Sequence, residues 1–479
     1  MGAGQGPTDR AYPCGLTKLL KMSTPDAELA ALAAELPDHA VITDPAVIEG
    51  YRRDAALDPE AGRARAVVRA GSTEDVQAVL RWASAHRVPV VPRGAGSGLA
   101  GGANGVDGGI ILSTERMRDI RIDTASRTAV VQPGLINSEV KKAAAEHGLW
   151  YPPDPGSVEI SSIGGNAATN AGGLCCVKYG VTSDYVLGMQ VVLADGTAVR
   201  LGGPRLKDVA GLSLTKLFVG SEGILGVITE LTLRLIPAQP PASTAVALFG
   251  SVQDAADAVV AITDKVRPAM LELMDHATIN AVEDYRRMGL DRSAEAMLLV
   301  QSDAPGAAAE EIAHIVEACE KSGATEVYAT DDAEEGAAFT AARRLVGLAL
   351  MQLGTFYLED VTVPIPDLPE LVAGIKRIAE DCDVLICVVA HAGDGNTHPV
   401  VVFDAEDPDM SERARLAFAR VMELAIAMGG TITGEHGIGR LKRDWLPLQL
   451  GDDVMALTRR IKDALDPQGI LNPGAVLRS

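Results

Sequence analysis

The sequence predicts an α+β protein made of two units followed by a C-terminal segment. Strand and helix patterns alternate over residues 65–133 and again over residues 243–430. Between these regions, residues 237–242 read Pro-Ala-Gln-Pro-Pro-Ala, a composition typical of a linker. The length of 479 residues also favours two or three domains. We therefore expect a domain boundary near residue 238.

The first region opens with a helix and then alternates strands with helices. Ser72 or Thr73 can cap a helix that has apolar residues at positions 76, 79, 80 and 83. Gly148 is placed to end a later helix, and Asp195-Gly196 is a strong hairpin signal. We expect helices at 26–36, from 72 onward and at 136–147, and strands at 65–69, 88–91, 109–112, 128–131, 191–194 and 197–201.

The second region shows the same alternation with longer helices. The apolar periodicity predicts helices at 251–265, 307–321, 333–353 and 367–380. It predicts strands at 270–274, 296–301, 325–329, 356–363, 384–390 and 400–403. Residues 431–479 are glycine-rich, then helical, and end in a turn-rich tail.

Charge and composition exclude several classes of function. With 43 basic and 64 acidic residues the net charge is −21, which disfavours a partner that is a nucleic acid. No uncharged apolar run is long enough to span a membrane, and the N-terminus lacks a signal-type apolar core. We expect residues 1–22 to be a disordered leader, with Met22 a candidate start. The six cysteines include no CxxC pair, so a cytoplasmic protein without its own iron–sulfur cluster is expected.

A glycine-rich loop follows the strand predicted at 88–91. Eight glycines fall within residues 94–109, and the loop contains a GxGxxG pattern at 96–101. A nicotinamide-type motif would open a helix, but residues 103–109 read Ala-Asn-Gly-Val-Asp-Gly-Gly and cannot start one. Consecutive glycines do allow backbone N–H groups to converge on an anion. The loop therefore predicts a phosphate cradle with no helix behind it, and a merely flexible loop is the alternative.

Two further glycine clusters support a cradle. Residues 152–173 carry the pairs Gly164-Gly165 and Gly172-Gly173, and residues 220–226 read Gly-Ser-Glu-Gly-Ile-Leu-Gly. Three such loops in one region predict a long, polar ligand that contains phosphate.

Histidines and a glutamate gather near the C-terminus. His391 follows a predicted strand, and the turn Asp394-Gly395 should bring it opposite His398. A second segment, residues 429–442, contains Glu435-His436. Two histidines and one carboxylate leave coordination positions open, which suits a catalytic Zn²⁺, Mn²⁺ or Fe²⁺. Histidines of turns and of the core are the alternative interpretation.

These segments together resemble a known family. The sequence is similar to the FAD-linked oxidase family of the vanillyl-alcohol oxidase fold, in its branch of D-2-hydroxyacid dehydrogenases. The resemblance covers roughly residues 40–477. Its motifs are PRGAGSGLAGGA at 92–103, PPDPGS at 152–157, SIGGNAATNAGG at 162–173, KYGVTSDYVLG at 178–188, LADG at 193–196, GSEGILGVIT at 220–229, HAGDGNTHP at 391–399, GGTITGEHGIGRLK at 429–442 and DPQGILNPG at 466–474.

The resemblance implies an architecture and a cofactor site. It implies an FAD-binding domain of two subdomains at 23–237, a cap domain at 238–430 that covers the flavin, and a segment at 431–479 that completes the active site and the flavin domain. Ser97 stands about where some relatives attach FAD through a histidine, so non-covalent FAD is expected. The implied FAD-binding residues are Pro92, Arg93, Gly94, Ala95, Gly96, Ser97, Gly98, Gly101, Pro153, Gly156, Ser157, Gly164, Gly165, Thr169, Gly172, Glu222, Gly226, Ile228 and Asn472.

The resemblance also implies a reaction. His391, His398 and Glu435 would bind a divalent metal, His436 would be the catalytic base, and Arg343 would hold the substrate carboxylate. A D-2-hydroxy acid would become the 2-oxo acid as hydride passes from C2 to flavin N5. Phe356-Tyr357-Leu358 and Pro399-Val400 stand where extra polar residues would hold a second carboxylate, which favours D-lactate or glycolate.

The expected partner is an external electron acceptor: a quinone, a cytochrome, an electron-transfer flavoprotein or an iron–sulfur subunit. A peripheral membrane location through that acceptor and a homodimer are both compatible with the sequence. Two alternatives stay open. One is the flavin subunit of a multi-subunit glycolate oxidase, and the other is a non-redox flavin-dependent transferase of the same fold.

Overall fold

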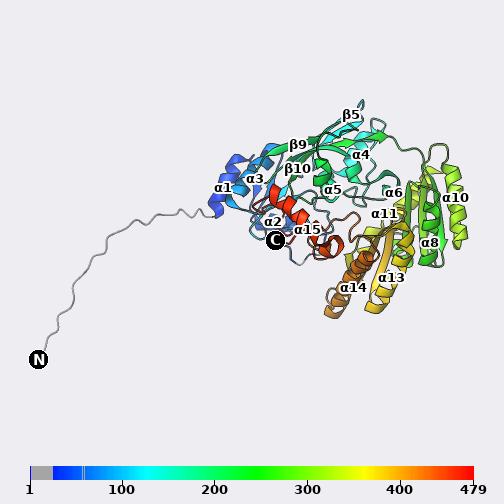
Figure 1. Ribbon diagram of the computed structural model, residues 1–479. Helices are drawn as coiled ribbons and strands as arrows, with labels where there is room; N and C mark the ends of the chain where they lie inside the picture. Colours follow the sequence, from blue (N-terminus) through cyan, green and yellow to red (C-terminus); the bar gives the residue numbers. More distant parts are fainter. Residues whose placement is uncertain (2–24, 57, 59, 479) are drawn as a thin grey trace.

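Two units with separate sheets lie side by side in the computed structural model (Figure 1). The structure describes the chain apart from residues 2–24, 57, 59 and 479, so the leader expected at 1–22 lies, except for Met1, outside the described residues. Among the described helices, none is long and apolar enough to cross a membrane. The N-terminal unit here means residues 25–237, and the second unit means residues 243–430.

The N-terminal unit contains two main sheets. A four-stranded sheet has the order β1-β2-β4-β3, in which β2, β4 and β3 are parallel. An antiparallel five-stranded sheet has the order β5-β6-β10-β8-β9, and β7 pairs with β11. The strands are β1 (Val41–Ile42), β2 (Ala66–Arg69), β3 (Val90–Arg93), β4 (Ile110–Ser113), β5 (Ile120–Asp123), β6 (Thr128–Val131), β7 (Leu149–Trp150), β8 (Val186–Val192), β9 (Ala198–Gly202), β10 (Val227–Arg234) and β11 (Ile236–Pro237).

The helices of this unit begin and end where the sequence signals lie. Ser72 caps α3 by accepting a hydrogen bond from the Asp75 amide at 3.1 Å, and the buried face of the helix is apolar. The turn between β8 and β9 contains Gly196 with a positive φ of 82°, as the hairpin signal predicts. The helices are α1 (Pro25–Glu35), α2 (Pro45–Tyr51), α3 (Thr73–His86), α4 (Asn137–Ala145), α5 (Ile163–Thr169), α6 (Cys176–Tyr179), the 3₁₀ turn η1 (Thr182–Asp184) and α7 (Leu214–Phe218).

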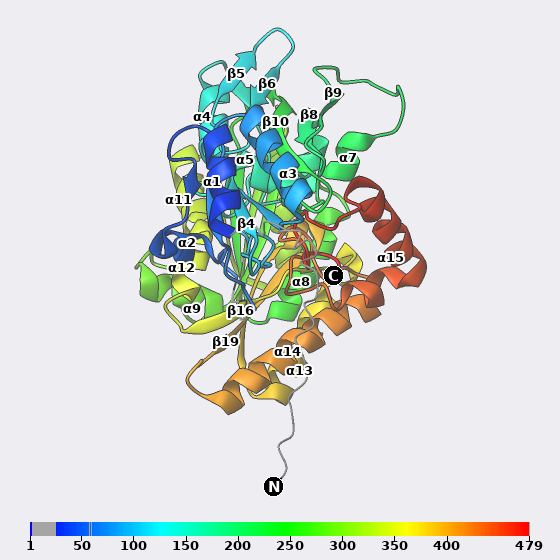
Figure 2. The ribbon, with the colours of Figure 1, turned by 90° about the vertical axis from the view of Figure 1, so that its left-hand side faces the viewer.

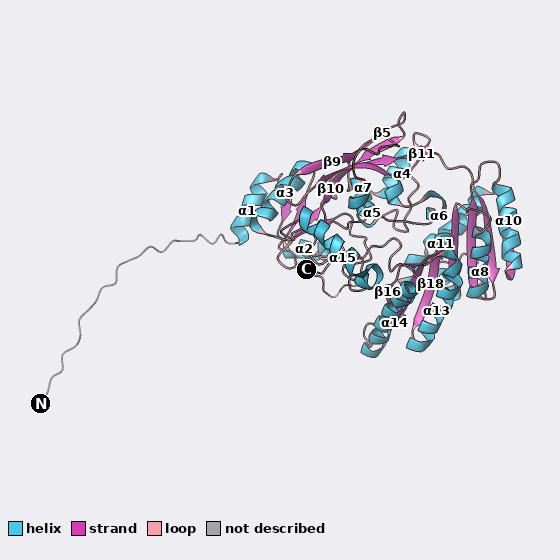
Figure 3. Ribbon diagram, viewed as in Figure 1, coloured by secondary structure: helices cyan, strands magenta, loops and turns pink. Residues whose placement is uncertain are grey.

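An eight-stranded antiparallel sheet forms the middle layer of the second unit (Figure 3). The order is β15-β12-β14-β13-β18-β19-β16, and β17 also pairs with β19. The strands are β12 (Ser243–Phe249), β13 (Met270–Asp275), β14 (Ala296–Ser302), β15 (Ala324–Thr330), β16 (Thr355–Leu358), β17 (Val361–Thr362), β18 (Leu385–His391) and β19 (Asn396–Phe403).

Helices cover both faces of this sheet. One core joins the sheet to α8 (Val252–Thr263), α10 (Ala308–Lys321), α13 (Leu368–Cys382) and α14 (Pro408–Ala427). A second core on the other face joins it to α9 (His276–Tyr285), α11 (Ala333–Arg344) and α12 (Val346–Leu350). The short 3₁₀ turns η2 (Ile365–Asp367) and η3 (Ala392–Asp394) complete the unit. Because strand residues alternate in direction, one sheet can fill both cores.

Three expectations about local structure need correction. The helix expected at 333–353 is divided into α11 and α12 and ends at Leu350. The strand expected at 356–363 is divided into β16 and β17 by Glu359 and Asp360, which lie opposite Pro399, a residue with no N–H for the ladder. The second glycine cluster is not only loop, because residues 163–169 form α5, capped by Ser162.

The C-terminal segment returns to the N-terminal unit. The helix α15 (Leu446–Leu465) is interrupted at Gly451, and it lies beside α14 in the view of Figure 2. Its last turns pack on the core of the five-stranded sheet. Further on, the Val90 amide donates to Ile470 O at 2.8 Å, which joins the tail to β3. Residues 433–439 therefore lie on a connection between the two units.

Candidate active site

A large cavity lies between the two units. Its volume of about 1300 Å³ exceeds the ~300–1,000 Å³ common for small-ligand pockets. The glycine-rich loop after β3 and the segments 154–169 and 221–228 line one side. Side chains of α11, α12, β16, β18, β19 and the loop after α14 line the other. The cavity can thus hold a long ligand together with a small one.

Most of the expected site residues line this cavity. They are Pro92, Arg93, Gly94, Ala95, Gly96, Ser97, Gly98, Gly156, Ser157, Gly164, Gly165, Thr169, Glu222, Gly226, Ile228, Arg343, His391, His398, Glu435 and His436. Four others, Gly101, Pro153, Gly172 and Asn472, are not among the lining residues. Asn472, for example, is buried and donates its amide hydrogens to Gly102 O and Glu222 O at 2.8 Å each.

The N-terminal side of the cavity fits a flavin dinucleotide. It is made largely of backbone, since a Cβ added at Gly94 would lie only 2.2 Å from the Ser162 hydroxyl oxygen. The Arg93 guanidinium is bound by backbone carbonyls, donating to Arg53 O at 2.9 Å and Ala103 O at 3.3 Å. The loop therefore presents amides and little side-chain bulk, as an anionic cofactor requires.

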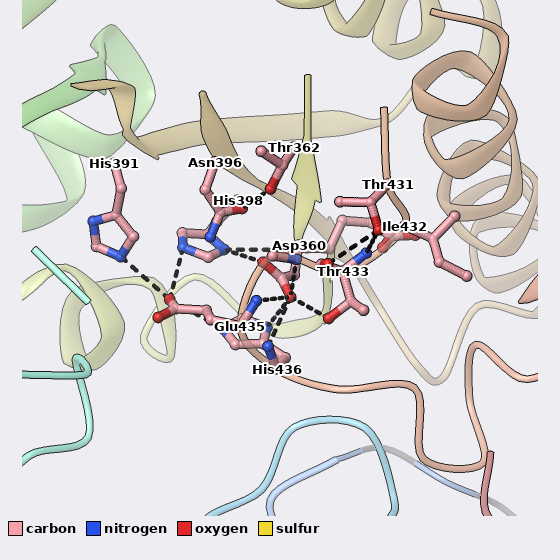
Figure 4. Close-up of polar contacts among 12 residues, drawn as sticks. Asp360, Thr362, His391, Asn396, His398, Thr431, Ile432, Thr433, Glu435 and His436 are labelled. Atoms are coloured by element: carbon pink, nitrogen blue, oxygen red, sulfur yellow. Dashed lines mark hydrogen bonds and ion pairs between the residues drawn. The ribbon is translucent and has the colours of Figure 1, made fainter. Parts of the chain in front are cut away.

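His391, His398 and Glu435 converge on the opposite side of the cavity (Figure 4). Glu435 Oε1 lies 3.2 Å from His391 Nε2 and 3.2 Å from His398 Nε2. The two imidazole centroids are 5.1 Å apart across η3, with the ring planes at 88°, so the turn at Asp394-Gly395 brings the two histidines together, as expected. The second oxygen of Glu435, Oε2, is buried and has no hydrogen-bond partner among the described residues.

A second layer of charge stands behind His391. Its Nδ1 lies 2.9 Å from both oxygens of Glu272, which is buried in β13. The Arg343 guanidinium forms an ion pair with the same carboxylate at 2.7 Å. Arg343 is itself buried, and within the described chain its Nε has no hydrogen-bond partner. A carboxylate behind a metal-binding histidine commonly fixes its tautomer and orientation.

His436 stacks on His398 with ring centroids 4.9 Å apart. Its Nδ1 lies 3.9 Å from Asp360 Oδ2, too far for a hydrogen bond, and its Nε2 lies 3.8 Å from Glu435. Burial lowers the pKa of His436 to about 4, because desolvation disfavours the imidazolium. The side chain is thus a neutral imidazole that lines the cavity.

The charges of the group are strongly coupled. Burial opposes ionisation of Glu435, but His391 and His398 outweigh it and hold the pKa of Glu435 well below its usual range. Burial likewise opposes the charged form of His391, but Glu272 and Glu435 raise its pKa well above the ordinary value. A bound divalent cation would take the place of protons on such imidazoles.

The donor set fits a divalent metal with open coordination positions. Two imidazole nitrogens and one carboxylate oxygen lie within 4.8 Å of one another. Nitrogen and oxygen donors of this kind suit Zn²⁺, Mn²⁺ or Fe²⁺, and three protein ligands leave room for a substrate oxygen.

Glu272 and Asp360 were not among the residues that the sequence pointed to. Glu272 is a charged residue inside the apolar strand Met-Leu-Glu-Leu-Met, and such a position is a usable signal. Asp360 follows Glu359 directly after the uncharged stretch 345–358. Both are fully or almost fully buried, at 1% and 0% exposure. Buried carboxylates need partners, so each points to a neighbouring polar group.

Comparison with solved structures defines the class of fold. The chain resembles p-cresol methylhydroxylase with a TM-score of 0.78 at 18% identity, covering 94% of this chain and 96% of that one. It also resembles alkyldihydroxyacetonephosphate synthase with a TM-score of 0.71 at 18% identity, covering 94% and 85%. At such identity the likeness concerns the fold alone, which is the flavoprotein fold of the vanillyl-alcohol oxidase type.

Sequence comparison then identifies the family. Residues 64–202 match the FAD binding domain, and residues 239–476 match the FAD linked oxidases, C-terminal domain. The chain is 45% identical over 413 residues to "Glycolate oxidase subunit GlcD" of Bacillus subtilis (strain 168), covering 85% of this chain and 88% of that protein. It is 36% identical to "D-lactate dehydrogenase" of Archaeoglobus fulgidus, covering 90% and 96%. The chain belongs to the FAD-linked oxidase family and is an FAD-dependent oxidoreductase.

Proposed function

We propose that this chain oxidises a small 2-hydroxy acid, D-lactate or glycolate, to the 2-oxo acid with non-covalent FAD and a divalent metal ion. One observation carries the proposal: the glycine-rich loops, the His391–His398–Glu435 group, His436 and Arg343 all line one cavity. The names of the two relatives above support this substrate class.

Each of these residues has a separate role in the proposed reaction. Arg343 binds the substrate carboxylate through its planar guanidinium. His391, His398 and Glu435 hold the metal, which when bound supplies a Lewis acid for the substrate oxygens. His436, a neutral imidazole, accepts the hydroxyl proton. FAD, when bound, would supply the acceptor for the hydride from C2, with an external acceptor as the expected destination of the electrons.

The wall near the metal-binding side chains favours a small or apolar substrate. Met270, Phe356, Leu358, Val389 and Val400 line the same cavity and carry no charge. A second carboxylate against this wall would lose its hydration without gaining a partner. Arg344 also lines the cavity, and its guanidinium is paired with Asp154 at 3.2 Å, as that of Arg343 is paired with Glu272 at 2.7 Å. D-lactate and glycolate therefore fit better than a 2-hydroxy diacid.

The test is anaerobic bleaching of the flavin absorbance by a panel of acids. D-lactate or glycolate should bleach it, whereas L-lactate and D-2-hydroxyglutarate should be much slower. If none of these acids reduces the flavin, the proposed function is wrong.

A variant of the proposal is that the chain is the flavin subunit of a larger glycolate oxidase. The word "subunit" in the name of the Bacillus subtilis relative favours it. Purification from the native source under mild conditions tests it, because a subunit should co-elute with a cysteine-rich protein and a solitary enzyme should not.

A further inference from the structure

One buried carboxylate holds the backbone of the loop that carries Glu435 and His436. Asp360 Oδ2 accepts hydrogen bonds from the amides of Gly434 at 3.0 Å, Glu435 at 3.0 Å and His436 at 2.8 Å. It also accepts one from the Thr433 hydroxyl at 2.6 Å. Asp360 is 0% exposed, and Figure 4 shows its side chain at the centre of these contacts.

A second buried carboxylate holds the far end of the same loop. Glu222 Oε1 accepts from the Ile438 amide at 2.7 Å, and Oε2 accepts from the Gly439 amide at 2.8 Å. Gly439 has a φ of 52°, and a Cβ there would lie 2.0 Å from Ala100 O of the glycine-rich loop. Asp360 belongs to the second unit and Glu222 to the N-terminal unit, so the loop 433–439 is fixed from both sides of the cavity.

These contacts set where two functional side chains point. A carboxylate that accepts several backbone amides forms charge-assisted hydrogen bonds, which are stronger than neutral ones. Supporting groups of this kind keep the ligands of a site within a narrow geometry. Behind Asp360, Lys442 and Glu359 form a buried ion pair at 3.2 Å, and Lys442 Nζ also donates to Ile432 O at 2.8 Å.

Asp360 also lies near two imidazoles, which raises a competing role. Asp360, His398 and His436 are close enough together to hold a cation themselves. Oδ2 already accepts four donors, however, and Oδ1 lies 3.7 Å from His398 Nδ1. The arrangement of Oδ2 favours anchoring of the backbone over metal ligation.

We propose that Asp360 is a positioning residue that presents Glu435 to His391 and His398, and that Glu222 fixes the same loop to the flavin side. The two carboxylates thereby attach one end of the loop to the second unit and the other end to the N-terminal unit. The inference rests on the metal site of the proposed function and does not depend on the substrate.

The test measures metal affinity of the FAD-loaded protein, with no hydroxy acid present. Zn²⁺ competition against a chromophoric chelator should show that Asp360→Asn weakens Zn²⁺ binding ~10–100-fold, the usual effect of losing such a support. FAD content should stay at the wild-type level. Thr433→Val removes one of the four donors and should shift affinity less, in the same direction.

A matched control separates anchoring from general damage. Asp275 is another buried carboxylate of the second unit, and it accepts from the amides of Thr278 and Val388. Asp275→Asn should leave Zn²⁺ affinity within about twofold of wild type. Equal losses of Zn²⁺ affinity in Asp360→Asn and Asp275→Asn would overturn the proposal. An unchanged Zn²⁺ affinity in Asp360→Asn would also overturn it. Complete loss of Zn²⁺ binding in Asp360→Asn but not in Thr433→Val would overturn it in favour of Asp360 as a metal ligand.

Hydrogen exchange supplies a readout that needs neither metal nor substrate. Asp360→Asn should speed exchange of the amides at 434–436, and Glu222→Gln should speed exchange at 438–439. Unchanged exchange in both variants would contradict the two-sided anchoring. A wild-type protein that fails to oxidise hydroxy acids but shows these shifts would refute the proposed function and leave this inference intact.

Discussion

On the N-terminal side of the cavity the chain presents backbone, and on the opposite side it presents charged side chains. At Gly94 and Gly96 the requirement is only that no Cβ is present. On the other side, His391, His398 and Glu435 must each direct a nitrogen or oxygen atom toward one point. Buried carboxylates contact the His391 ring and the Glu435 backbone from behind. The difference implies that added bulk on one side should affect FAD alone, whereas removed charge on the other should affect metal and chemistry alone.

The largest expected effect is loss of the proposed base. His436→Ala should keep its FAD but reduce the rate of flavin reduction by D-lactate or glycolate ~10²–10⁴-fold, the usual contribution of a general base. Stopped-flow absorbance under anaerobic conditions measures it. His314→Ala, which changes an exposed histidine of α10, is the control. Normal bleaching in His436→Ala would remove this residue from the mechanism.

The next effect concerns the carboxylate behind His391. Glu272→Gln should weaken metal binding ~10–100-fold, because the neutral amide holds the imidazole less firmly. FAD content should not change. Equilibrium dialysis with Zn²⁺ measures the affinity, and Glu326→Gln on the exposed strand β15 serves as control. If Glu272→Gln lost FAD rather than metal, the division between the two sides would be wrong.

On the N-terminal side of the cavity, an added side-chain atom should weaken FAD binding. Gly94→Ala places a Cβ against the Ser162 hydroxyl and should weaken FAD binding by about tenfold, or ~1.4 kcal/mol, within the range for overpacking. Zn²⁺ affinity should be unaltered. Gly50→Ala is the matched control, because a Cβ there meets nothing within 4 Å. Fluorescence titration of the apoproteins with FAD gives the FAD affinity of each variant. Equal FAD affinities of Gly94→Ala and Gly50→Ala would contradict the tight packing of the loop at Gly94.

The smallest effect concerns a contact between the units. Asp303, at the end of β14, accepts hydrogen bonds from Lys178, Tyr179 and Gln239. Burial opposes its ionisation, but these three donors outweigh it and keep the pKa of Asp303 below its ordinary value. The carboxylate therefore stabilises the fold above the unfolded pKa of ~3.9, and this contribution is lost as pH falls through the lower folded value.

Asp303→Asn should cost about 1 kcal/mol of unfolding free energy at pH 7. Urea unfolding at several pH values measures it. The difference from wild type should shrink below pH ~4, where Asp303 begins to protonate in the unfolded chain but not yet in the folded protein. A difference that is constant down to pH 3 would show that the charge of Asp303 does not stabilise the contact.

How far the sequence predicts this molecule depends on whether a feature is local. Ser72 and Gly196 act through their own neighbours, so the helix and hairpin that they signal are both found. The metal-side histidines could be paired because only a short turn separates them. The interruption between β16 and β17 depends on Pro399, forty residues further along the chain, which no local pattern contains.

The supporting roles of Glu272 and Glu222 could not be predicted for the same reason, although Glu222 itself is one of the FAD-binding residues that the resemblance implies. Glu272 meets His391 across 119 residues, and Glu222 meets Ile438 across 216. Such contacts arise only when the sheet of the second unit and the loop 433–439 are assembled. The residues proposed to bind ligands sit in recognisable motifs, whereas the contacts of the residues proposed to orient them are set by tertiary structure.

The central claim is that the two sides of the cavity act on one substrate, and removal of the metal tests it most directly. Protein stripped with a chelator should retain its FAD but should no longer be bleached by D-lactate or glycolate under anaerobic conditions. Adding back Zn²⁺ or Mn²⁺ should restore bleaching. Full-rate flavin reduction in metal-free protein would contradict the claim.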